Sequence, residues 1–250
     1  HRDLHSFPTR RSSDLSRDRW LAALRLQPVD RLLFWAKLNP SYLRGRAAPF
    51  AAMSLPEMHA WVGSEPHGGV PPCLREVRSR TQHRTSQAGG RRITEFVTPG
   101  GTLRQVLGWD EGSTSWHPVE YPLRTQRDVE ILTEWHLDGV VELDAAALEK
   151  ARAAAQQAGR TACLACNIGT SPLMDFLQHL AGVDYGQYLL ADCPATVQGL
   201  FAAMQKSNLR RAEIISDTTP ADFLYLTENT STTRSEERRV GKECRSRVPP

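Results

Sequence analysis

The chain has 250 residues, five cysteines and a formal net charge of +3 at pH 7. This length suffices for one large domain with a sizeable core. No window approaches the roughly 18 apolar residues that predict a membrane span, so the sequence predicts no membrane partner. Cysteines this sparse fit reduced thiols in a cytoplasmic protein better than a disulfide framework.

The two ends of the chain look foreign to the rest. Residues 1–15 and 234–247 can be back-translated into opposite strands of one DNA segment, which is the pattern of a sequencing adapter translated on both sides of an insert. Residues 248–250 depart from that pattern. Segments of this kind are excluded from fold reasoning in the same way as tags and fusion scars. We therefore expect a domain fragment over residues 16–233, flanked by disordered tails.

The tails also account for the basic character of the chain. Residues 1–15 contribute three arginines and two aspartates, and residues 234–250 contribute five arginines, one lysine and three glutamates. The insert keeps 22 basic and 23 acidic side chains, a net charge of −1. An arginine-rich tail is otherwise typical of a nucleic-acid-binding arm. Without it, the sequence predicts no nucleic-acid partner.

Two helices and one strand are predicted at the start of the insert. Ser16 or Asp18 can cap a short amphipathic helix. The continuous apolar run Leu32–Ala36 predicts a buried strand. Ser54–Glu57 has the spacing of a capping box and predicts a second helix, followed by a loop over residues 63–72.

A β-hairpin is predicted in the middle of the insert. Residues 91–97 and 102–109 are rich in β-forming side chains, and Thr98-Pro99-Gly100-Gly101 lies between them. Glycine adopts positive φ without steric cost, so this tetrapeptide is a strong turn signal. We expect the two segments to pair as neighbouring antiparallel strands.

The second half of the insert alternates helices and strands. Thr125 and Asp144 can cap helices, the second of which covers residues 145–158. Strands are predicted over residues 160–168 and 221–227, with helical segments between them. Strands that alternate with helices predict a parallel α/β sheet.

Isolated cysteines, histidines and tryptophans carry little functional signal in this chain. Cys163 and Cys166 form a CxxC, but positions i and i+3 of a strand point to opposite faces, so the two thiols would not converge. They are expected as small core residues rather than as a metal or redox pair. The histidines lack a second ligand at metal spacing, and the tryptophans are most simply packing residues. These residues are His117, His136, His179, Trp20, Trp35, Trp61 and Trp135.

Several segments of the insert share the order of a known family. They are Arg19–Leu24 with Pro28–Arg31, the hairpin Glu95–Leu103, and the strand–helix junctions Gly169–Leu173 and Ala221–Leu224. In these segments the chain resembles the uroporphyrinogen decarboxylase family, which includes corrinoid and cobamide methyltransferases. The resemblance implies an α/β fold of the (β/α)8 barrel type with its site at the carboxyl ends of the strands. With an N-terminal helix and the β-hairpin as elaborations, we expect an incomplete barrel of three or four strands with an open edge.

The resemblance also points to substrate-binding residues. The decarboxylases of the family carry two arginines after the first strand, and these clamp substrate carboxylates because guanidinium pairs bidentately with carboxylate. Here that stretch holds Lys37, Asn39 and Tyr42, of which the tyrosine alone is retained. Lys37 keeps one charge without the fork. An anion contact and an ordinary surface lysine are equally compatible with it.

Further candidates lie at later strand and helix positions. Gln178 takes the place of a helix tyrosine of the family, and Asn229 takes that of a strand-end serine, behind the acidic Glu228. Glu228 and Asn229 are therefore the candidate catalytic residues, with a solvated loop as the alternative. Asn167 lies at the end of a predicted strand, where it can contribute to substrate binding in the pocket or cap a turn.

In its hairpin and in the loss of the arginine pair, the chain resembles the methyltransferase-like branch of the family better than the decarboxylases. That resemblance implies methyl transfer between a corrinoid and a thiol, with a methyl-corrinoid, free or on a corrinoid protein, as the substrate. The chemistry needs zinc, which lowers the pKa of a bound thiol so that the thiolate can attack. The zinc ligands would follow residue 233, so no cofactor and no metal ligand is expected within the insert.

Two alternatives stay open. A tetrapyrrole decarboxylase, which is a carboxy-lyase, would need a rearranged anion clamp of arginine or histidine, since its substrate carries many carboxylates. A non-catalytic barrel could instead bind a small molecule. Because the second half of the site would follow residue 233, we expect the chain as given to be inactive. We also expect its open strand edge to favour aggregation or partial unfolding.

Overall fold

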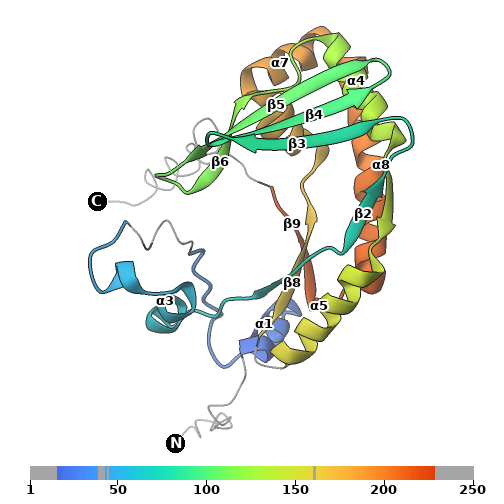
Figure 1. Cartoon of the computed structure of the whole chain (residues 1–250). Coiled ribbons are helices and arrows are strands. Elements are labelled where there is room, and N and C mark those ends of the chain that lie inside the picture. Colours follow the sequence, from blue (N-terminus) through green and yellow to red (C-terminus); the bar gives the residue numbers. More distant parts are fainter. Residues whose placement is uncertain (1–15, 39–42, 44, 160–161, 229–250) are drawn as a thin grey trace, which may run out of the picture.

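The computed structural model describes residues 16–38, 43, 45–159 and 162–228. Three strands form a parallel sheet in the order β1 (Gly68–Val70), β8 (Leu164–Gly169) and β9 (Phe223–Leu226). Parallel neighbours need crossover connections, and these contain the helices α5 (Ala145–Ala158) and α8 (Pro194–Thr218) (Figure 1). The strand predicted over residues 221–227 is confirmed as β9.

Helices α5 and α8 cover the same face of the parallel sheet. Val70 and Cys166 from the sheet pack with Leu148 of α5 and Ile215 of α8 in one buried cluster, which we call the lower core. Side chains that alternate with these point to the other face. Tyr225 on that side is 39% exposed, so the concave face of the sheet is partly open to solvent.

A second sheet is antiparallel and has four strands in sequence order. They are β3 (Gln82–Ala88), β4 (Arg91–Thr98), β5 (Gly101–Asp110) and β6 (Ser115–Glu120). The turn between β4 and β5 is held by the Gly100 N–H, which donates to the Thr98 hydroxyl oxygen, and Gly101 has a φ of 150°. The predicted hairpin is therefore confirmed, at the position where glycine is required.

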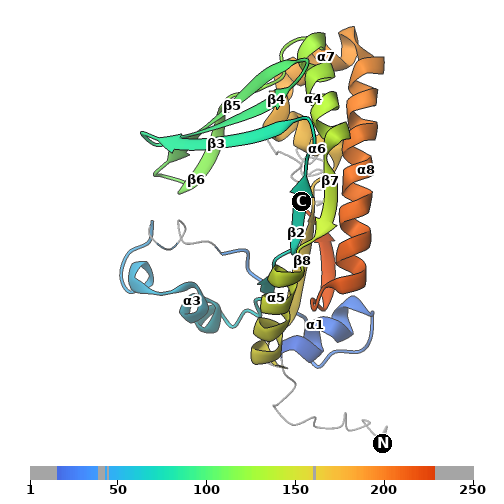
Figure 2. The same cartoon turned by 45° about the vertical axis from the view of Figure 1, so that its right-hand side comes forward.

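One face of this hairpin sheet packs on helices. Phe96 and Leu103 lie in a buried cluster with α4 (Gln126–Asp138), α7 (Gly182–Asp192) and the N-terminal half of α8. We call this cluster the upper core. Helix α8 has 25 residues and is about 37 Å long, so it contributes to both cores (Figure 2).

A two-stranded antiparallel sheet connects the two cores: β2 (Leu74–Val77) and β7 (Val140–Leu143). The turn after β2 is fixed by the buried carboxylate of Asp138. That carboxylate accepts hydrogen bonds from the backbone N–H groups of residues 79–81 and from the hydroxyls of Ser79 and Thr81. These bonds, led by that of the Ser79 hydroxyl, lower the pKa of Asp138.

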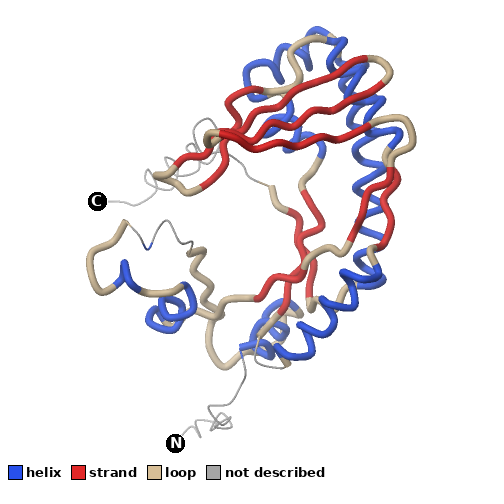
Figure 3. The backbone as a smooth tube through the Cα atoms, viewed as in Figure 1, coloured by secondary structure: helices blue, strands red, loops and turns tan. Residues whose placement is uncertain are grey.

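The N-terminal segment consists of short helices joined by loops (Figure 3). It holds α1 (Ser16–Leu24), the turn η1 (Phe50–Ala52) and α3 (Leu55–Val62). Arg19 forms ion pairs with Asp30 and with the buried Glu65, which attach α1 to the loops that follow. The capping box of Ser54 and Glu57 is confirmed at the start of α3.

The strand predicted over Leu32–Ala36 is wrong. These residues have no regular secondary structure, and Leu32 is 87% exposed. Within the described residues, a single backbone hydrogen bond, from Glu65 to the Phe34 carbonyl, joins this run to another segment, so no ladder forms. The tryptophans Trp35 and Trp61 are 44% and 62% exposed, but each packs on another ring as expected, Trp35 on His67 and Trp61 on Phe50.

The loop predicted over residues 63–72 is also wrong, because Gly68–Val70 forms β1. A Cβ atom at Gly68 would lie 2.8 Å from the Leu164 side chain. Glycine therefore permits the close approach of β1 to β8. Because the glycines of β1 carry no side chains, this segment lacks the alternation of apolar and polar residues by which a strand is recognised in a sequence.

The mixture of helices and sheets confirms the α/β class. In the described part of the chain the strands form three separate open sheets, and no closed barrel is found there. None of the described helices is long and apolar enough to cross a membrane.

Candidate functional site

A cleft of about 480 Å³ lies at the carboxyl end of β8. Its walls come from the hairpin sheet, from α4 and α8, and from the segment that follows β8. Ligands of α/β proteins bind at the carboxyl ends of parallel strands, and this volume suits a small molecule. Polar side chains that line the cleft include His136, Asp175, His179, Asn208 and Arg211.

The segment that follows β8 has unusual helical geometry. It forms α6 (Pro172–Asp175) and then a π-helical turn, η2 (Phe176–Leu180). A backbone hydrogen bond of 2.8 Å from the Ala181 N–H to the Phe176 carbonyl closes the turn with i→i+5 spacing. π turns are rare and occur frequently at functional sites. The helix predicted after residue 172 is therefore present, with a geometry that its sequence pattern did not indicate.

Two long-range hydrogen bonds hold this segment in place. The Gln105 side chain on β5 donates to the His179 carbonyl at 2.7 Å. The Asn208 side chain on α8 donates to the Thr170 carbonyl at 3.1 Å. The hairpin sheet and α8, which form two walls of the cleft, are thus both hydrogen-bonded to the segment that follows β8. This is the arrangement expected of a preformed binding site.

Arg211 places a half-buried guanidinium in the cleft, one turn after Asn208. Among the residues that the structure describes, it has no hydrogen-bond or ion-pair partner. It lies within electrostatic range of Asp175. Burial raises the pKa of Asp175, and the positive charges of His179 and Arg211 oppose that effect without cancelling it. Asp175 therefore holds a proton more readily than an ordinary aspartate.

His136, at the end of α4, contributes a neutral imidazole. Burial lowers its pKa to about 4; the Glu76 carboxylate opposes this shift and the Arg78 guanidinium reinforces it. At neutral pH the ring therefore has one N–H that can donate a hydrogen bond and one nitrogen that can accept another, and it carries no charge. It adds polarity to the cleft and leaves Arg211 as a lining cation.

Glu228, expected as a catalytic residue, does not line the cleft; it contacts Ser171, which follows the cleft residue Thr170. Its carboxylate accepts hydrogen bonds from the Ser171 N–H at 2.7 Å and from the Ser171 hydroxyl at 2.9 Å. Ser171 is the N-cap of α6, and its hydroxyl oxygen accepts from the Met174 N–H. Glu228 thus fixes the start of the segment that carries Asp175. Its carboxylate also suits the positive end of the helix.

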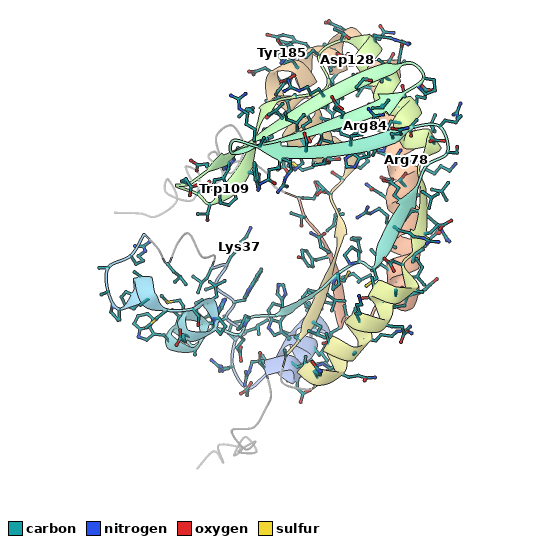
Figure 4. The ribbon with its side chains drawn as sticks, viewed as in Figure 1. Lys37, Arg78, Arg84, Trp109, Asp128 and Tyr185 are labelled. Carbon is teal, nitrogen blue, oxygen red and sulfur yellow. The ribbon has the colours of Figure 1, made fainter. Side chains whose placement is uncertain are left out.

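The expected substrate-binding residues are dispersed. Asn167 joins the ends of β8 and β9, since its amide donates to the Thr227 hydroxyl and its oxygen accepts from the Gly169 N–H. Gln178 lies half-buried in η2, next to His179. Lys37 is exposed on the N-terminal segment and does not line the cleft (Figure 4). Asn39, Tyr42 and Asn229 lie outside the described residues.

The described cysteines are core residues. All four are buried: Cys73, Cys163, Cys166 and Cys193. Burial raises the pKa of each thiol, that of Cys163 to about 11, so thiolates are disfavoured. Within the described ranges, no group of three or more His, Cys, Asp or Glu is arranged to hold a metal ion. The zinc ligands implied by the resemblance would lie outside these ranges.

Several cleft residues were not predicted from the sequence. His136 and His179 were treated as isolated because their neighbours come from remote segments. On α8, Met204, Asn208 and Arg211 recur at helical spacing and line one wall. That periodicity was a detectable signal of a shared face. No pattern in the sequence indicated the π turn.

No protein-family model, curated protein or solved structure matches this chain.

Proposed function

We propose that the cleft binds a small carboxylate-bearing molecule and exchanges a proton with it. The observation that supports this is the half-buried guanidinium of Arg211, which has no hydrogen-bond or ion-pair partner among the described residues and lies within electrostatic range of Asp175, whose pKa is raised. An arginine in this setting pairs readily with a carboxylate, through charge-assisted hydrogen bonds in a fixed fork. Asn208, one turn earlier on the same helix, offers a further polar group.

Asp175 is the proton donor in this proposal. When a carboxylate leaves as CO2, the carbon–carbon bond breaks and its electron pair stays on the substrate carbon. That carbon then needs a proton, and burial raises the pKa of the Asp175 carboxyl group, which makes it a better proton donor to that carbon than an ordinary aspartate. The neutral His136 can orient the substrate by hydrogen bonding. These groups favour the carboxy-lyase alternative, with Arg211 as the rearranged anion clamp.

Methyl transfer between a corrinoid and a thiol stays a prediction. It requires a zinc-bound thiolate, and the described cysteines are buried with raised pKa values. The described residues therefore offer support for carboxylate binding and none for thiolate chemistry. A cleft that binds a carboxylate without turning it over would support the third alternative, a non-catalytic binding protein.

We further propose that the parallel sheet is part of a (β/α)8 barrel. Its strands follow sequence order, and both crossover helices lie on one face. Doubly wound sheets carry helices on both faces, whereas a barrel carries them outside only. The cleft then lies at the end of the barrel where such enzymes hold their substrates.

Titration of the full chain with succinate and citrate tests carboxylate binding. Arg211→Met should weaken binding by about 1.5–3 kcal/mol, or roughly ten- to hundred-fold in Kd, measured by calorimetry. Arg210→Met is the matched control, because Arg210 is exposed and paired with Glu213 on the same helix. Equal affinities for the wild type and for Arg211→Met would contradict the proposal.

The pKa of Asp175 gives a second readout. In carboxyl-carbon NMR it should lie above the ordinary value for an aspartate, because burial raises it. Since the Arg211 charge lowers the pKa of Asp175, Arg211→Met should raise it further, and Arg210→Met should leave it unchanged. An Asp175 pKa that is the same in the wild type and in Arg211→Met would show that the anion-binding residue Arg211 does not influence the proton donor Asp175.

A further inference from the structure

The hairpin sheet continues past the cleft along the face that lines it. Gln105 and Leu107 of β5 both line the cleft. Side chains of a strand alternate between faces, so Trp109 lies on the same face as Leu107 and about 7 Å farther along. Trp109 is 38% exposed and lies at the free end of the sheet (Figure 4).

Two more side chains join Trp109 on this face. Trp116 of β6 is its direct cross-strand partner, with ring centroids 5.4 Å apart at 61°. Arg92 of β4 is opposite Leu107 in register, and its guanidinium carbon lies 4.4 Å from the centre of the Trp116 ring. We call Arg92, Trp109 and Trp116 the tryptophan platform. None of the three belongs to the upper or lower core.

Packing accounts for only part of this arrangement. A cross-strand tryptophan pair stabilises a hairpin by itself, but it can do so on either face of the sheet. Here the pair stands on the cleft side, where Leu107 joins it to the cleft wall, and a cation is stacked on one ring. Aromatic rings bind planar π-systems by stacking, and a stacked guanidinium adds attraction for an anionic or aromatic ligand.

We propose that the tryptophan platform binds the aromatic part of the ligand whose carboxylate is held at Arg211, which makes the ligand an aromatic carboxylate. This inference rests on the proposed function for the Arg211 end. The platform supplies stacking surface, Leu107 supplies the apolar connection, and Arg211 supplies the anion contact. Aliphatic carboxylates of the same size would bind through the Arg211 contact without stacking on the platform.

The test compares 2-naphthoate with its saturated analogue, decahydro-2-naphthoate, by calorimetry on the full chain. Aromatic stacking adds affinity beyond that of the buried area, so 2-naphthoate should bind about five-fold more tightly, or about 1 kcal/mol. Trp109→Leu should abolish that difference, and Trp109→Phe should retain most of it. Trp61→Leu, at an exposed tryptophan of α3, should change neither affinity. Equal binding of the two probes to the wild type would overturn the platform.

A neutral probe, 2-naphthalenemethanol, separates the two proposals. If the wild type binds it and Trp109→Leu does not, the platform stands. If in addition 2-naphthoate binds no more tightly than this alcohol, the carboxylate anchor at Arg211 is overturned and with it the assignment of both ends to one ligand. If Trp109→Leu and Trp109→Phe bind 2-naphthoate equally and circular dichroism shows both folded, stacking is excluded.

Discussion

The two cores differ in how completely they enclose their sheets. The upper core places Phe96 and Leu103 of the hairpin sheet against helices from three parts of the chain. The lower core is smaller and covers one face of the parallel sheet, while Tyr225 and Leu226 beyond it are 39% and 47% exposed. Helix α8 contributes to both, so one rigid element connects a well-packed region to a partly open one. The cleft lies between them and takes residues from α8 and from the hairpin sheet.

The largest effect is expected from truncating the upper core. Leu200 is fully buried on α8, and Leu200→Ala should reduce the free energy of unfolding by about 4 kcal/mol, since the surrounding helices cannot collapse into the cavity. Leu148 of the lower core is also buried, but it lies in a smaller cluster. Leu148→Ala should cost about 2–3 kcal/mol.

Urea unfolding monitored by fluorescence and by circular dichroism measures both variants. Equal losses of unfolding free energy would show that the two cores are equally well packed, contrary to our expectation. Two separate unfolding transitions in the wild type, with the lower region unfolding first, would show directly that the lower region is the less stable one. The exposed concave face of the parallel sheet is the physical reason to expect that order.

The second effect concerns low pH, where the order in which the upper and lower regions open should reverse. Burial holds the pKa of His136 at about 4, below the ordinary value of about 6.5, so the neutral form is favoured in the folded state. A group with a depressed pKa stabilises the fold above its unfolded value and loses that contribution as pH falls. Between pH 6.5 and about 4 the loss should reach about 3 kcal/mol. The upper region should then become the first to open.

Hydrogen exchange in α4 and in α5 at pH 7 and pH 4.5 measures this reversal. His136→Gln should remove most of the acid sensitivity of α4. His117→Gln should not, because His117 is exposed on β6. Unchanged protection of α4 at pH 4.5 would show that His136 is solvated in the folded protein.

The sequence predicted features whose hydrogen bonds are local. The capping box of Ser54 and Glu57 and the turn at Gly100 each involve residues within a few positions of one another. The strand β1 depends instead on β8, almost a hundred residues later, and two glycines removed its pattern. The apolar run Leu32–Ala36 had a strand-like sequence and no partner to pair with.

The candidate site was predictable to a smaller extent for the same reason. Asp175 and Arg211 come from different elements, and neither has a neighbour in sequence that indicates a site. The packed fold, with its π turn, brings them within electrostatic range of each other. The sequence did point to the carboxyl end of the parallel strands and to Glu228, which lies there with a positioning contact.

The smallest effect concerns that contact. Glu228 connects the end of β9 in the lower region to the N-cap of α6, which leads into the cleft. Glu228→Ala removes two hydrogen bonds and a favourable charge at a helix N-terminus, and should cost about 1 kcal/mol. Glu228→Gln should cost less, since its amide oxygen can still accept. Glu149→Ala, at an exposed ion pair of α5, is the control for removal of a surface carboxylate.

If Glu228 transmits the stability of the lower region to the cleft, Glu228→Ala should increase hydrogen exchange across residues 172–180 and weaken succinate binding a few-fold. An increase in exchange confined to β9 would show that the cleft depends on the upper region alone.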